Sequence, residues 1–192
     1  INRLYVVYKR RMHVKKAFQI SLFATAKYNE TFNNEYIKTI EKNLKESDDL
    51  IEYFHSLPIK LKKEIRINNP KHLSDIYNSK TSAYAFIGKP HKMYESATRA
   101  LNEIEKYSKG SDRNINLFEA YHQVILGSIG TNNLSDTVYY LNQSKNIATQ
   151  LVNNDEGLLT LANYLTFQLP TLINVGLYAE AEDLLDFVNN FL

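Results

Sequence analysis

The chain of 192 residues contains no cysteine, only four prolines and only six glycines. Without cysteine it has no disulfide, no thiolate metal site and no cysteine nucleophile. An all-β protein with many turns needs more glycine and proline than this. These absences disfavour an all-β protein and fit a reducing compartment, and we expect a cytoplasmic protein. We also expect no cofactor.

Long apolar runs are missing as well. No run approaches the roughly 18 apolar residues that a membrane span needs. The short run Leu4–Tyr8 precedes its basic cluster, which is the reverse of a signal peptide. The chain is 44% hydrophobic, enough for the core of one domain. Because the first residue is Ile1 rather than Met, we expect residues 1–192 to be a single domain of a longer protein.

Charge is unevenly distributed although the net charge is only +2. Up to Lys71 there are 15 Lys and Arg against 8 Asp and Glu, whereas from His72 onward there are 8 against 13. A basic half and an acidic half can steer a charged partner toward the protein. They can equally be two solvated faces, and the sequence favours that interpretation.

Apolar residues recur at steps of three and four along most of the chain, which is typical of amphipathic helices. The segment Leu57–Asn68 differs, because isoleucines alternate there with Lys and Arg after Pro58, and it is either a short helix or an extended connector. We expect about eight or nine helices in total. Their expected ranges are Arg3–Asn29 as one helix or two abutting ones, Asn34–His55, Asn69–Gly88, Pro90–Ser108, Asp112 or Asn114 to Gly130, Ser135 or Asp136 to Asn153, and a helix from Asp155 that Pro170 kinks near Thr166 ahead of a final hairpin.

The last stretch, Leu161–Leu192, has the clearest pattern. Gly176 is followed by Tyr178 and Ala181, and then by Leu185 and Val188. This spacing resembles the turn and second helix of a tetratricopeptide repeat, a helix-turn-helix unit of about 34 residues. Related turns occur at Asn33, Lys89 and Asn132, so that the intervals up to Gly176 are roughly 56, 43 and 44 residues.

The resemblance implies a right-handed α-solenoid of antiparallel helix hairpins, and an ordinary helical bundle is the alternative. It also implies a concave surface formed by the first helix of each pair. Side chains with amides and hydroxyls dominate the positions that would face this surface, and amides can pair with the backbone of an extended peptide. The candidate peptide-binding residues are Asp75, Asn78, Ser82, Gln123, Asn163, Thr166 and Asn174.

Sites for catalysis or metal binding are not evident in the sequence. The five histidines have no metal-ligand spacing, and Gly127–Gly130 lacks the lysine of a phosphate-binding loop. The carboxylate pairs, Glu103 with Glu105 and Asp48 with Asp49, point to different sides of their helices and cannot act together as acid and base. We therefore expect neither an enzyme nor a metal protein.

Three functions are compatible with this pattern. The favoured one is a non-catalytic scaffold or sensor that binds a peptide or protein segment. In a sharper form it resembles the ligand-sensing repeat domain of peptide-responsive bacterial transcription regulators. The second is a structural protein that assembles with itself, for which Phe187 and Phe191 are candidate interface residues, covered by further repeats or by another copy. The third and least favoured is a nucleic-acid binder that uses Lys9–Lys16 and Lys60–Arg66.

The basic cluster near the start of the chain generates a first prediction. We expect negligible affinity for duplex DNA at physiological salt, because the cluster has the spacing of an amphipathic helix. Reversing the charges of Lys9, Arg10, Arg11, Lys15 and Lys16 should leave folding intact. Tight binding to a duplex that weakens steeply with added salt, measured by fluorescence anisotropy, would contradict this expectation.

Overall fold

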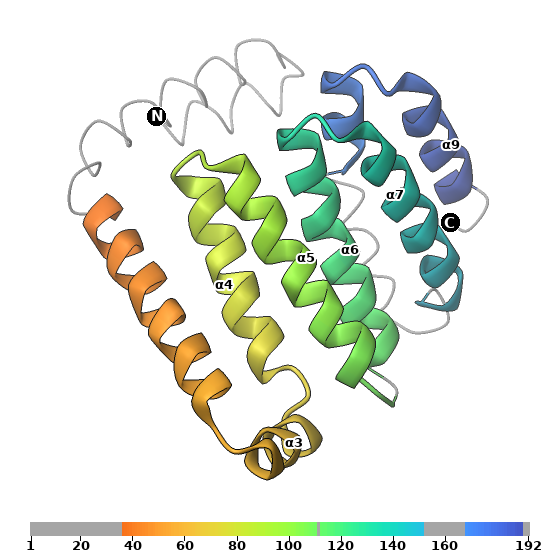
Figure 1. Ribbon diagram of the computed structural model, residues 1–192. Coiled ribbons are helices and arrows are strands. Elements are labelled where there is room, and N and C mark those ends of the chain that lie inside the picture. Colours follow the sequence, from red (N-terminus) through yellow and green to blue (C-terminus); the bar gives the residue numbers. More distant parts are fainter. Residues whose placement is uncertain (1–35, 111, 152–167, 190–192) are drawn as a thin grey trace, which may run out of the picture. The chain divides into compact units, whose positions relative to one another are not determined.

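The computed structural model describes residues 36–110, 112–151 and 168–189, and every regular element in these ranges is a helix (Figure 1). The expectation of an all-α protein is confirmed for this part of the chain. None of the described helices is long and apolar enough to cross a membrane. The elements are the helical residues 36–56, α3 (Ile59–Asn68), α4 (His72–Phe86), α5 (Pro90–Tyr107), α6 (Arg113–Gly130), α7 (Leu134–Leu151), the helical residues 168–174, and α9 (Tyr178–Asn189).

The chain divides into two compact units, Ile1–Asn43 and Leu44–Leu192. Of the first unit the structure describes only residues 36–43, so the contacts discussed below all lie within the second. That the chain is one domain of a longer protein stays a prediction. The expected first helix and the expected kink near Thr166 lie outside the described residues.

Three turns between paired helices have the same backbone hydrogen bonds. Each contains one residue with a positive φ, namely Gly88 (67°), Asn132 (58°) and Gly176 (79°), and these follow one another at intervals of 44 residues. The N–H of this residue donates to the carbonyl three positions earlier, and the next N–H donates to the carbonyl five positions earlier. This is the Schellman motif, which satisfies the last carbonyls of a helix. The turns expected from sequence at these places are therefore confirmed.

The second helix of each pair begins two residues after the positive-φ residue, and its buried positions recur at the same interval. Met93 in α5, Thr137 in α7 and Ala181 in α9 are 44 residues apart and are all buried. Ala97 and Leu141 are likewise equivalent and almost completely buried, at 0% and 1% exposure. The same faces of α5 and α7 therefore pack in the same way, as repeated units do.

Packing follows the order of the chain. Helix α4 packs on α5, α5 on α6, and α6 on α7, and these helices lie side by side in Figure 1. The helices approach closely where small residues allow it, since a Cβ at Gly127 of α6 would lie 2.7 Å from the Cα of Tyr94 in α5. Three groups of buried side chains result: Ile51, Phe54, Leu73, Tyr77 and Ala100; Ala97, Leu101, Ile104, Leu117, Ala120, Tyr121 and Val124; and Phe118, Ile125, Leu141, Ala148, Leu151, Leu172, Ala181 and Leu184.

Helix α4 begins later than expected. The sequence Asn69-Pro70 has the form of a helix start, but the backbone N–H of Asn69 donates to the carbonyl of Ile65 at 2.8 Å and so completes α3 instead. The carbonyl of Asn69 then accepts the N–H of His72 at 3.1 Å. The two residues thus form a turn between helices, and α4 starts at His72.

Helix α7 begins earlier than expected. The side-chain oxygen of Asn133 accepts the backbone N–H of Asp136 at 3.3 Å, and its amide donates to the Asp136 carboxylate at 2.8 Å. Asn133 is therefore the N-cap residue, in place of Ser135 or Asp136. The backbone N–H of the same residue also closes the preceding turn, so only residues 131–133 separate α6 from α7.

The burial of Ala181 leads to a prediction about stability. We expect Ala181→Asp to lower the free energy of unfolding by about 3 kcal/mol or more, because it places a carboxylate at a 4% exposed position among apolar side chains. Ala179→Asp in the same turn is the control, since Ala179 is exposed and a carboxylate there should change stability by less than about 0.5 kcal/mol. Urea unfolding followed by far-UV circular dichroism measures both. Equal stability of the two variants would contradict the placement of this hairpin.

Candidate functional site

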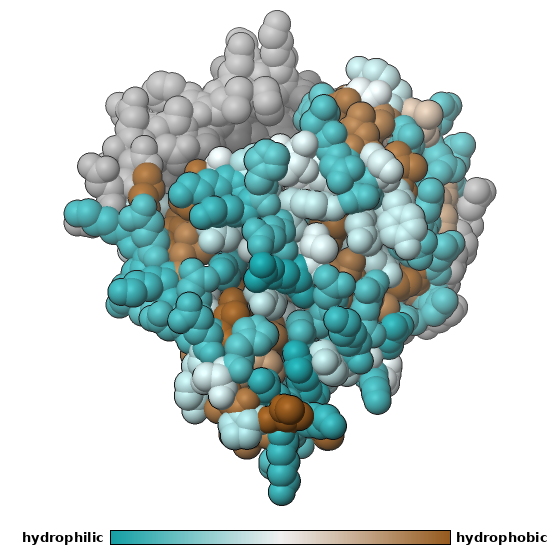
Figure 2. Space-filling view, in the orientation of Figure 1, coloured by the Kyte–Doolittle hydropathy of each residue, from teal (hydrophilic) through white to brown (hydrophobic). Residues whose placement is uncertain are grey.

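Helix α3 resolves the alternative left open for Leu57–Asn68, because it is a short helix that begins after Pro58. It differs from the other helices in that none of its residues is buried. Ile59 and Ile67 are 72% and 79% exposed. Figure 2 shows hydrophobic side chains at the surface at this end of the molecule, among mostly hydrophilic neighbours. An exposed helix that displays isoleucines is a candidate interaction surface.

An ion pair between Arg66 and Glu103 joins α3 to α5. The guanidinium of Arg66 donates from Nη2 to both carboxylate oxygens of Glu103, at 2.9 and 3.0 Å, and from Nε at 3.1 Å. It also lies over the rings of Tyr107 and Phe54, with its Cζ 4.1 and 5.0 Å from their centroids. The side chains of Arg66 and Glu103 are only 19% and 15% exposed, so this ion pair is weakly screened by solvent.

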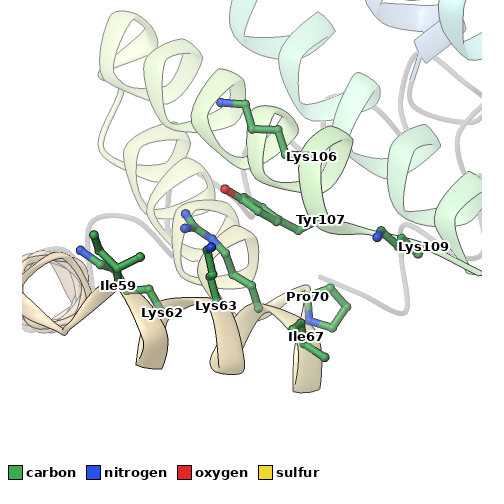
Figure 3. Close-up of a pocket in the computed structure, with 9 residues that line it drawn as sticks. Ile59, Lys62, Lys63, Ile67, Pro70, Lys106, Tyr107 and Lys109 are labelled. Atoms are coloured by element: carbon green, nitrogen blue, oxygen red, sulfur yellow. The ribbon is translucent and has the colours of Figure 1, made fainter.

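A pocket of about 650 Å³ lies between α3 and the C-terminal end of α5 (Figure 3). Helix α3 contributes Ile59, Lys62 and Lys63 from one side, and α5 contributes Lys106 and Tyr107 from the other. The complete lining consists of Ile59, Lys62, Lys63, Arg66, Ile67, Pro70, Lys106, Tyr107 and Lys109. We call it the α3–α5 pocket.

Positive charge dominates this pocket. Its lining holds five basic side chains and no acidic one. Glu103 neutralises Arg66, and the ammonium of Lys62 donates to the backbone carbonyl of His55 at 3.0 Å. Among the described residues, no ion pair involves Lys63, Lys106 or Lys109. A concave site with one sign of charge concentrates the field and attracts ligands of the opposite charge.

Apolar side chains form the rest of the lining. Ile59, Ile67, Pro70 and the ring of Tyr107 offer surface that a charged small ion alone would not cover. The pocket can therefore hold an anionic group beside its lysines and an apolar group against its isoleucines at the same time. This combination is the chemical basis for assigning a function.

No family model, curated protein or solved structure matches this chain. The likeness of Gly176, Tyr178 and Ala181 to a tetratricopeptide repeat therefore stays a prediction, and function is inferred from the site itself.

The residues predicted to face a concave surface lie elsewhere. Asp75, Asn78 and Ser82 share one side of α4, and Gln123 lies on α6. Asp75 and Ser82 are exposed, whereas Asn78 is half-buried and its side-chain oxygen is buried without a hydrogen-bond partner. None of these residues lines the α3–α5 pocket. Asn174 is exposed at the end of the helical residues 168–174, and Asn163 and Thr166 lie outside the described residues. Peptide binding by this set stays a prediction.

The predicted interface residues are only partly described. Phe187 is half-buried and packs against the buried group that includes Ala181 and Leu184, whereas Phe191 lies outside the described residues. The structure instead exposes Tyr178 and Leu185 of the pattern that begins at Gly176, at 67% and 44%.

The titratable groups with large pKa shifts include His122 and Tyr94, which both lie outside the pocket. Burial lowers the pKa of His122 to about 4, so its imidazole is neutral at pH 7. Burial, together with the hydrogen bond and charge of Asp136, raises the pKa of Tyr94 to about 12. The Tyr94 hydroxyl donates to that carboxylate and joins α5 to α7. Among the described residues, no group of three His, Asp or Glu side chains could hold a metal ion.

Sequence reasoning missed the pocket because its two walls are far apart in the chain. Lys60–Arg66 was recognised as a basic segment, but its partner across the pocket is the segment Lys106–Lys109. Glu103, which the sequence shows only as a neighbour of Glu105, pairs with Arg66 across 37 residues. The sequence feature that could have indicated this site is the alternation of isoleucine with Lys and Arg after Pro58, which differs from the three- and four-residue spacing of the other helices.

The Arg66–Glu103 pair generates a prediction about α3. We expect Glu103→Gln to weaken the attachment of α3 by about 1–3 kcal/mol, because it leaves a mostly buried guanidinium without its counter-charge. Backbone amides of α3 should then exchange faster with solvent while those of α6 keep their rates. Glu105→Gln, at an exposed position of the same helix, is the control and should leave α3 unchanged. Hydrogen exchange by mass spectrometry that shows no difference between the two variants would contradict this role of Arg66.

Proposed function

We propose that this chain is a non-catalytic helical-repeat module that binds an acidic segment of a protein in the α3–α5 pocket. The observation that carries the proposal is the lining of that pocket, which combines exposed isoleucines with lysines that form no ion pair with any residue of the described part of the chain. Lys63 and Lys106 would hold the carboxylates of the segment, and Ile59 and Ile67 its apolar side chains.

The repeated turns support the first half of this proposal. Gly88, Asn132 and Gly176 mark units of 44 residues whose second helices bury equivalent positions. Helical repeats of about 34 to 47 residues stack into solenoids whose surfaces bind other proteins. An α-solenoid similar to the tetratricopeptide type is therefore the architecture that we propose, with α3 as an addition before the first full pair.

The composition of the pocket favours a protein segment over a nucleic acid. A surface for nucleic-acid backbone needs several basic side chains along a polar track. Here the lysines alternate with isoleucines, and Glu103 already neutralises the arginine. A peptide that carries Asp or Glu beside Leu or Tyr matches both halves of the lining.

Binding of a defined peptide tests this function. The probe is a fluorescein-labelled 12-residue peptide of Glu, Asp, Leu and Tyr, compared with a second peptide in which Lys replaces every acidic residue. We expect anisotropy to report saturable binding of the acidic peptide only. Lys63→Glu with Lys106→Glu should weaken it by at least about tenfold, because carboxylates would then face carboxylates.

Lys60→Glu provides the matched control. Lys60 is exposed on the same helix and outside the pocket lining, so a charge reversal there should have little effect. Ile67→Ser should also weaken peptide binding, since the apolar part of the contact is lost. Failure of the acidic peptide to bind, or equal losses in the Lys60 and Lys63 variants, would contradict the proposal. Preferential binding of duplex DNA or RNA would assign the pocket to nucleic acid instead.

A further inference from the structure

The last described pair of helices leaves a face of α9 open. Three residues occupy equivalent positions in the three pairs, at intervals of 44 residues: Ala97, Leu141 and Leu185. Ala97 and Leu141 are 0% and 1% exposed, whereas Leu185 is 44% exposed. A position that the next helices cover in the first two pairs is thus uncovered in the third.

This open face is acidic and apolar. Tyr178, Glu182 and Leu185 follow one another at steps of four and three residues, so they lie on one side of α9, with Asp186 next to them. Tyr178 is 67% exposed, and Glu182 and Asp186 are exposed without an ion pair among the described residues. Helix α9 contains four acidic residues and no basic one. Of these four acidic residues, Asp183 forms an ion pair with Lys145 of α7.

We infer that the acidic segment that enters the α3–α5 pocket is α9 of a second copy of this chain. Glu182 and Asp186 would face the ammonium groups of Lys63 and Lys106, while Tyr178 and Leu185 would cover the exposed isoleucines. Complementary charge and apolar surface on both sides carry this assignment. It rests on the proposed function, because it names the partner of the same pocket.

The two surfaces belong to different ends of the series of packed helices. Helix α3 is tied to α5 in the first pair, and α9 belongs to the third pair, with α6 and α7 between them. At about 10 Å per packed helix, the three steps from α5 to α9 place α9 roughly 30 Å from the pocket of its own chain. A second copy is therefore needed. The contact is head-to-tail, which generates chains or rings rather than a symmetric pair.

Sedimentation equilibrium of this chain over a range of concentrations tests the inference. We expect the parent to associate, and added salt to weaken the association. Glu182→Lys with Asp186→Lys should weaken it by about tenfold or more, and so should Lys63→Glu with Lys106→Glu. Lys60→Glu should associate like the parent. Mixing the two double variants should restore a complex, since lysines on α9 of one variant then meet glutamates in the pocket of the other.

The outcomes separate this inference from the proposed function. If the parent stays monomeric but binds the acidic peptide, the pocket keeps its proposed function and the second copy is excluded as its occupant. If the pocket variant associates as strongly as the parent, two α9 helices meet each other and the head-to-tail contact is wrong. If the parent neither associates nor binds the acidic peptide, both proposals fail.

Discussion

One residue in a left-handed conformation at the end of the first helix of each pair sets the geometry of the described structure. Gly88, Asn132 and Gly176 each allow a Schellman turn, and the next helix starts two residues later. Because the turn has the same hydrogen bonds each time, the second helix of each pair buries the same early position, at Met93, Thr137 and Ala181. An L-amino acid other than Asn would be strained at these positions.

Helix α3 departs from this regular pattern, and that departure creates the site. None of its residues is fully buried. It is held by Ile65, which packs against the buried group that includes Phe54, and by the bidentate contact between Arg66 and Glu103. Glu103 neutralises the charge of Arg66 in this contact. The lysines of the lining have no such partner among the described residues, so the pocket is cationic although the ion pair that joins α3 to α5 is neutral.

Features that depend on a few adjacent residues could be predicted from the sequence, whereas contacts between distant segments could not. Turns at Gly88, Asn132 and Gly176 could be predicted, because their signal lies in a few adjacent residues. The predicted starts of α4 and α7 were wrong. The backbone N–H of Asn69 completes α3 and that of Asn133 closes the turn after α6, and both roles depend on backbone geometry. The pocket could not be predicted, since no local pattern pairs Arg66 with Glu103. The sequence instead led to the prediction of a peptide-binding surface that includes polar residues of α4 and α6.

The central claim is that the α3–α5 pocket receives the acidic segment, and hydrogen exchange with the acidic peptide bound tests it most directly. The account predicts slower exchange at the amides of α3 and the last turn of α5 when the peptide is saturating, and unchanged rates along α4 and α6. Protection that instead follows Asp75, Asn78, Ser82 and Gln123, with α3 unaffected, would contradict the account and place the peptide on the surface that the sequence alone had favoured.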